Sequence, residues 1–185
     1  AINKFKPQFI INCSAYTKVE LAEIESEKAY AINYEGVKNL TKVAKLNKAA
    51  LIHFSTDYVY DGKKKSAYIE TDKASPINQY GFSKLKGENY ITKNSNYFFI
   101  FRISGVFSHN GENFVKSMMR LKDRDELAIV SDQIMKPSSA KFIANFLRIN
   151  LLKNNFTEEN SGLYNLPSQG SEISWHDFAK LIFQE

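Results

Sequence analysis

The run Ala50-Leu51-Ile52-His53-Phe54-Ser55 governs which kind of sheet this chain forms. Its apolar residues do not alternate with polar ones, as they would in a strand with only one covered face. A run of this kind is typical of a strand buried on both faces, and therefore of a parallel sheet. Residues 8–13 (QFIINC) form another apolar run without alternation, and residues 97–102 (YFFIFR) predict a third strand.

Helical patterns separate these runs. In residues 22–48, apolar side chains recur at roughly helical spacing, with lysine, glutamate and asparagine between them. The remaining sequence predicts helices at 78–93, 113–122, 138–153 (opened by Pro137 and a capping Ser138) and 174–183, and short strands at 127–130 and 163–166. Buried strands that alternate with helices predict an α/β fold with a doubly wound, Rossmann-like parallel sheet. We expect residues 1–130 to form a partial dinucleotide-binding domain and residues 131–185 a smaller substrate-side region.

Sheets of this type bind ligands beyond the carboxyl ends of their strands. That rule directs attention to residues 12–17, 55–60 and 103–108, each of which directly follows a predicted strand. The connection over residues 56–76 is long, with Asp61-Gly62 as a turn signal, and loops of that length are often functional.

Composition excludes several classes of protein. The 185 residues are 43% hydrophobic and 24% charged, as in ordinary globular domains, and no run approaches the ~20 apolar residues of a membrane span. The net charge of +5 comes from scattered lysines with only four arginines, so we expect no nucleic-acid partner. A single cysteine, Cys13, and three histidines without metal-ligand spacing predict no disulfide and no metal site. A reducing, cytoplasmic location follows as the default.

Tyr80-Gly81-Phe82-Ser83-Lys84 is the sharpest local signal for chemistry. Residues four apart lie on one face of a helix, and an ammonium beside a phenol lowers its pKa, so that it can exchange a proton near neutral pH. With 10 tyrosines and 21 lysines such a pair also arises by chance. Thr56 adds weight, because it follows a buried strand and could hydrogen-bond the same substrate oxygen. Taken singly, Thr56 is equally well explained as a capping or turn residue.

Six motifs occur in one order along the chain. Together they closely resemble those of the dTDP-4-dehydrorhamnose reductases, an extended branch of the short-chain dehydrogenase/reductases. The resemblance runs from about residue 7 to the end and is carried by residues 12–20 (NCSAYTKVE), 54–62 (FSTDYVYDG), 80–88 (YGFSKLKGE), 101–107 (FRISGVF), 113–115 (NFV) and 132–133 (DQ).

The resemblance implies a reaction and its catalytic residues. The enzyme would use NADPH or NADH to reduce the C4 keto group of a nucleotide-linked 4-keto-6-deoxysugar, above all dTDP-4-dehydrorhamnose. Tyr80 would protonate the carbonyl oxygen, Lys84 would lower the pKa of Tyr80 and hold the nicotinamide ribose, and Thr56 would orient the carbonyl. Positioned donors of this kind stabilise the alkoxide that hydride transfer develops.

The resemblance also implies binding residues and partners. The cofactor would lie along Cys13, Ser14, Ala15 and Thr17, as well as Tyr80 and Lys84. The sugar nucleotide would meet Thr56, Tyr58, Gly105 and Asn113, with residues 132–140 covering the substrate side. The resemblance is also compatible with a homodimer and with a divalent ion at a subunit interface.

The sequence departs from the family pattern at three places. It contains no G-x-x-G-x-x-G turn, whose backbone amides hold the cofactor pyrophosphate, and it stops early by the family pattern. We therefore expect either a piece of a longer protein or a chain whose sheet a partner chain completes. The preference between NADPH and NADH cannot be read from the sequence. Many relatives have tryptophan at Gly105, so glycine predicts a wider sugar pocket. Relatives also have glycine and threonine where this chain has Met135 and Ser138, and Met135 is bulky for a position that needs glycine's backbone freedom.

Two other functions compete with the enzyme. One is a non-catalytic binding protein, like the regulatory subunit of methionine adenosyltransferase, and the other is an inactive, truncated gene product. The intact set of Thr56, Tyr80 and Lys84 favours the enzyme, whereas the missing pyrophosphate turn favours the inactive product.

Overall fold

The computed structural model describes residues 2–184, apart from the side chain of Asn3, as two compact units. The first unit holds the chain up to Arg102 and a returning segment, Lys153–Leu166. The second holds Ile103–Leu152 and the chain from Pro167 onward. These contacts divide the chain at other points than the expected boundary after residue 130. The assignment of residues 1–130 and 131–185 to cofactor and substrate stays a prediction.

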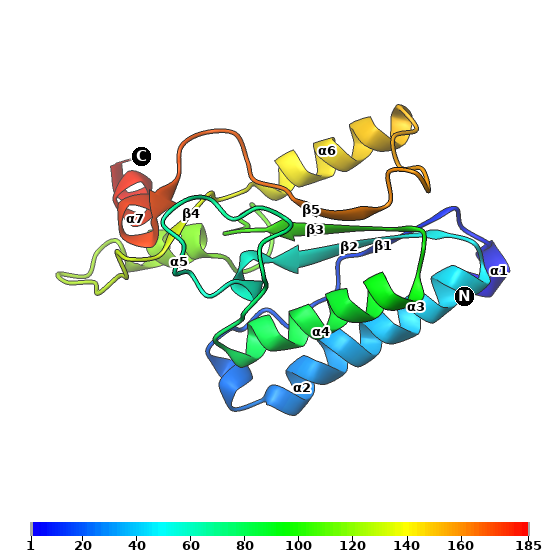
Figure 1. The fold of residues 1–185 in the computed structure, drawn as a ribbon. Coiled ribbons are helices and arrows are strands. Elements are labelled where there is room, and N and C mark those ends of the chain that lie inside the picture. The colour runs from blue at the N-terminus through cyan, green and yellow to red at the C-terminus, as the bar shows by residue number, and fades with distance from the viewer. Residues whose placement is uncertain (1, 185) are drawn as a thin grey trace. The chain divides into compact units, whose positions relative to one another are not determined.

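A four-stranded sheet is the centre of the first unit, and the order of its strands is β1-β2-β3-β5 (Figure 1). The pairs β1–β2 and β3–β5 are parallel, with Ile11 opposite Ile52 and Ile100 opposite Leu163. The parallel sheet predicted from the apolar runs is therefore confirmed. The strands are β1 (Phe9–Asn12), β2 (Ala50–Thr56), β3 (Phe98–Ile103) and β5 (Gly162–Asn165).

Strand β2 is almost entirely buried, which is why its sequence is apolar without alternation. Two helices, α3 (Val37–Leu46) and α4 (Gln79–Asn94), run side by side and pack against this strand (Figure 1). A shared core lies between them and the sheet, and it is formed by Val37, Ala44, Leu51, Ile91 and Ile100.

The single helix predicted for residues 22–48 is wrong in part. The chain forms a 3-10 turn η1 (Leu21–Glu23), helix α2 (Ser26–Tyr30), a π-helical turn η2 (Ala31–Gly36) and then α3. The backbone of Glu25 leaves the helical region between η1 and α2. The wider π turn carries the amide of Asn33 inward, where it is completely buried.

The second unit contains α5 (Phe114–Leu121), α6 (Ala140–Leu152), α7 (Trp175–Gln184) and a small antiparallel pair, β4 (Ile134–Met135) with β6 (Ile173–Ser174). The strand predicted at 127–130 is wrong, because that segment is irregular and pairing begins only at β4. Ser139 rather than Ser138 caps α6, since its hydroxyl accepts from the amide of Phe142 at 3.1 Å. The first unit also contains helix α1 (Ile2–Phe5) and the 3-10 turn η3 (Asp57–Val59).

Candidate active site

Helix α4 presents an unusual buried face. Tyr80, Lys84 and Glu88 follow one another at intervals of four residues, so they form one stripe along the helix, and all three are buried. The helix begins after Asn78, whose side-chain oxygen accepts from the amide of Gly81 at 2.7 Å. Polar and ionisable groups in such a position need specific partners, because burial without a partner costs free energy.

Two glycines let α4 approach its neighbours closely. A Cβ at Gly81 would lie 2.2 Å from the carbonyl oxygen of Tyr58, and a Cβ at Gly87 would lie 2.4 Å from that of Asn33. Both distances are far below ordinary contact. The glycines of the motif at residues 80–88 therefore bring the helix against η3 and η2.

Lys84 extends beneath the end of β2. Its ammonium donates to the carbonyl oxygen of Phe54 at 2.6 Å, and only 2% of the residue is exposed. Burial lowers the pKa of Lys84 to about 8, against the charge of Glu88, which raises it. Lys84 is thus a buried cation whose charge is only partly stabilised by its surroundings.

Tyr80 lies against the residues that follow β2. Its ring meets that of Tyr58 edge-to-face at 5.6 Å between centroids. Burial raises the pKa of Tyr80 to about 12, while a side-chain hydrogen bond with Thr56 lowers it and Asp57 and Tyr58 raise it. The pKa of Tyr80 is therefore raised overall in this structure, because desolvation and the charges of Asp57 and Tyr58 together outweigh the hydrogen bond with Thr56. The lowering of this pKa by Lys84 stays a prediction.

Thr56 has the capping role weighed for it, while its hydrogen bond to the substrate oxygen stays a prediction. Its hydroxyl accepts from the amide of Tyr58 at 3.2 Å and so caps η3. The same hydroxyl donates to Asp57 at 3.1 Å and forms the hydrogen bond with Tyr80. The structure thus brings Thr56, Tyr58, Tyr80 and Lys84 together at the carboxyl end of β2.

The segment after β1 holds the predicted cofactor residues. The hydroxyl of Ser14 donates to Asn12 at 2.6 Å, and Cys13 is an exposed free thiol rather than a small buried side chain. Further along, Ala15 and Thr17 line a cavity of about 270 Å³. Lys18, Lys28 and Glu25 line it too, and the Lys28 ammonium lies 3.2 Å from the Glu25 carboxylate. The pocket thus places the hydroxyl of Thr17 and the ammonium of Lys18, both suited to an anionic group, beside an ion pair.

Asn33 is the residue that the sequence analysis missed. Its side chain accepts from the amide of Tyr16 at 2.9 Å and donates to the carbonyl of Tyr16 at 3.1 Å. It also donates to the hydroxyl of Ser83 at 2.9 Å. One amide therefore ties the segment after β1 to α4. The sequence contained a signal for this, because Asn33 lies four residues from both Ala29 and Val37 and so falls on the apolar face of the helical pattern.

Gly105 and Asn113 belong to the second unit. Asn113 caps α5 by accepting from the amide of Lys116 at 3.3 Å, and it donates to the carbonyl of Ser108 at 2.8 Å. Gly105 has a φ of +49°, and a Cβ there would lie 2.5 Å from the sulfur of Met135. The side chain of Met135 thus occupies the space next to Gly105 in the direction of a Cβ, and the wider sugar pocket stays a prediction. Met135 itself lies in β4 and does not need glycine's backbone freedom.

The described residues provide neither a cluster of metal ligands nor a membrane-spanning helix. Between residues 2 and 184, no three side chains of histidine, cysteine, aspartate or glutamate come together in a way that could hold a metal ion. No helix in that range has both the length and the hydropathy that a bilayer crossing needs.

Comparison with known proteins gives one consistent result. The family model described as the RmlD substrate binding domain matches residues 1–185. The dTDP-4-dehydrorhamnose reductase of Aggregatibacter actinomycetemcomitans is 42% identical over 187 residues, which cover 100% of this chain and 63% of that protein. The reductase of the same name from Salmonella typhimurium is 39% identical, again over 100% of this chain and 62% of the relative.

Solved structures agree with the sequence relatives. The Clostridium acetobutylicum dTDP-4-dehydrorhamnose reductase ortholog has a TM-score of 0.90 at 36% identity, over 99% of this chain and 63% of that one. The Bacillus anthracis reductase, solved in complex with NADP, has a TM-score of 0.87 at 39% identity, over 99% of this chain and 64% of that one. The chain thus spans somewhat less than two thirds of the proteins that it matches.

Proposed function

Because the chain belongs to the RmlD substrate-binding-domain family, we propose that the protein carrying it reduces the C4 keto group of a nucleotide-linked 4-keto-6-deoxysugar. dTDP-4-dehydrorhamnose is the first substrate in this proposal, since relatives at about 40% identity are named as its reductases. NADPH or NADH supplies the hydride when bound, in keeping with the NADP complex of the Bacillus anthracis relative.

The observation that carries the proposal is the buried group of Thr56, Tyr80 and Lys84 at the carboxyl end of β2. With a pKa of about 12, the phenol of Tyr80 is protonated at neutral pH and can act as an acid. Its O–H bond breaks as the proton passes to the developing alkoxide. The hydroxyl of Thr56, turned from Asp57, can donate to the resulting phenolate, and the ammonium of Lys84, one helical turn further along, adds a positive charge.

Binding roles extend this proposal. Cys13, Ser14, Ala15 and Thr17 would contact the cofactor, and the pocket beside Ala15 and Thr17 supports this through the ammonium of Lys18. Tyr58, Gly105 and Asn113 would contact the sugar nucleotide. We further propose a cytoplasmic enzyme that acts as a homodimer and does not bind nucleic acid.

The test is turnover by the gene-encoded protein, followed as oxidation of NADPH and of NADH with dTDP-4-dehydrorhamnose. Tyr80→Phe should lower kcat by roughly 10²–10⁴, the usual share of general acid catalysis. Tyr90→Phe is the matched control, because Tyr90 lies on the same helix but packs against Tyr34 instead. Sugar-nucleotide binding without turnover would support the non-catalytic alternative, and full turnover by Tyr80→Phe would remove Tyr80 from its role.

A further inference from the structure

A buried ion pair lies next to the proposed catalytic residues. Arg102, at the end of β3, donates from Nε to one carboxylate oxygen of Glu88 at 3.0 Å and from a terminal nitrogen to the other at 2.6 Å. Only 7% of Arg102 and 1% of Glu88 are exposed. Both oxygens of the carboxylate are therefore engaged by a single guanidinium.

Glu88 is also a natural partner for Lys84. Residues four apart on a helix are neighbours on its surface, and a lysine and a glutamate at this spacing attract each other. The charge of Glu88 does act on Lys84, since it raises the pKa of the ammonium against the effect of burial. Lys84 nevertheless donates to the carbonyl of Phe54. Two buried cations thus compete for one carboxylate, and Arg102 holds it.

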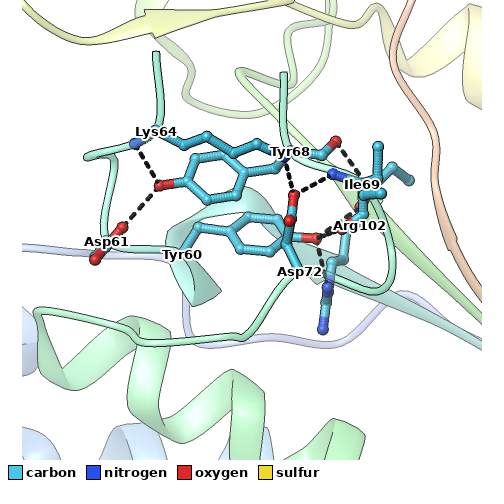
Figure 2. A network of polar contacts seen from close by, with 8 residues as sticks. Tyr60, Asp61, Lys64, Tyr68, Ile69, Asp72 and Arg102 are labelled. Atoms are coloured by element: carbon cyan, nitrogen blue, oxygen red, sulfur yellow. Dashed lines mark hydrogen bonds and ion pairs between the residues drawn. The ribbon is translucent and has the colours of Figure 1, made fainter. Parts of the chain in front are cut away.

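The remaining contacts of Arg102 hold its head group in place. Its third nitrogen donates to the hydroxyl of Tyr60 at 2.6 Å, and its guanidinium carbon lies 4.9 Å from the centre of the Tyr60 ring. Tyr60 in turn stacks on Tyr68 with 4.2 Å between centroids and donates to the carbonyl of Ile69 at 3.1 Å. Figure 2 shows this network joining Arg102 to the connection that follows β2.

We propose that Arg102 is a positioning residue, which binds both oxygens of Glu88 and so leaves the ammonium of Lys84 free to act beside Tyr80. The expected effect on turnover rests on the proposed function, whereas the expected position of the Lys84 side chain does not. Without Arg102, the carboxylate of Glu88 lacks a partner in a buried setting, where an unpaired charge is costly. Lys84 is then the cation within reach, and it turns away from the carbonyl of Phe54.

A set of three variants tests this idea in the gene-encoded protein: Arg102→Gln, Glu88→Gln and the double variant. Arg102→Gln should lower kcat by about tenfold or more, since a displacement of 1 Å in a catalytic group can cost 10²-fold. The double variant should recover most of that loss, because no carboxylate remains to attract Lys84. Glu88→Gln alone should keep Lys84 in place. If the ion pair only supports the fold, the double variant is no better than Arg102→Gln.

Crystal structures of the variants provide a readout that does not depend on turnover. Arg102→Gln should show the Lys84 nitrogen on Glu88, and the double variant should show it on the carbonyl of Phe54. A Lys84 that stays on Phe54 in Arg102→Gln overturns the proposal, whatever the activity. If Arg102→Gln does not fold, Arg102→Lys takes its place, since a lysine contacts the carboxylate at one point only and should give an intermediate kcat. Wild-type protein without reductase activity counts against the proposed function, while the crystal structures still decide the role of Arg102.

Discussion

Gly81→Ala is the substitution that most directly tests how α4 is placed. The added Cβ would lie 2.2 Å from the carbonyl oxygen of Tyr58, 2.9 Å from the side chain of Pro76 and 3.0 Å from the carbonyl carbon of Tyr58. Backbone atoms cannot give way as a flexible side chain would. The start of α4 and the segment after β2 must therefore move apart by about 1 Å to restore ordinary contact.

Two opposing effects set the size of the change in stability. Overpacking of a close contact costs roughly 1–3 kcal/mol, while alanine gains up to about 1 kcal/mol over glycine within a helix. The cap is kept, because the amide of residue 81 still donates to Asn78. We expect Gly81→Ala to lower the free energy of unfolding by about 1–2 kcal/mol on this balance. Turnover should fall further, by about 10²-fold, because Tyr80 adjoins the displaced residue.

Gly36→Ala is the matched control. Its Cβ would meet only the carbonyl oxygen of Ala31, at 3.6 Å, which is ordinary contact. This variant should gain roughly 0.5–1 kcal/mol and keep full turnover. Urea unfolding of both variants gives the stabilities, and oxidation of NADPH with the sugar nucleotide gives the rates. If Gly81→Ala is as stable and as active as Gly36→Ala, the close approach of α4 to Tyr58 does not exist in solution.

Three shorter predictions concern buried and capping groups. Burial and, to a smaller extent, the charge of Lys84 hold the pKa of His53 well below 6.5 in the native state. Stability should therefore fall as the pH drops below about 6.5, because the unfolded state then binds the proton more readily. Denaturant titrations of His53→Gln should show a weaker dependence of stability on pH. Lys84 has a pKa of about 8 in the native state and 10.5 in the unfolded state, so the unfolded state binds more protons between these values and stability should rise with pH from about 8. Above about pH 10 the raised pKa of Tyr80 should make stability fall again. Lys84→Met should lack the rise. Asn78→Ala removes the cap of α4 and should cost about 1 kcal/mol in thermal or urea unfolding, whereas an unchanged midpoint would mean that the cap is dispensable.

Local patterns were enough to predict the sheet and most helices. The runs at residues 50–55 and 97–102 are apolar because their strands are buried on both faces, and such burial requires apolar side chains without alternation. The order of the motifs was enough to identify the family, and with it the roles proposed for Thr56, Tyr80 and Lys84. Residues 22–48 and 127–130 were predicted less well, because a π turn and an irregular segment are stabilised by distant contacts that leave no periodic pattern.

Only the tertiary structure revealed how the ionisable groups are shared. The sequence shows Lys84 four residues before Glu88, and helical spacing alone would pair them. Arg102 comes from a different strand, and its bond to Glu88 exists only because β3 lies beside α4's buried face. In the same way, spacing predicted a lowered pKa for Tyr80, whereas desolvation raises it. Desolvation depends on everything packed around a group, so it is a property of the folded chain and not of any motif within it.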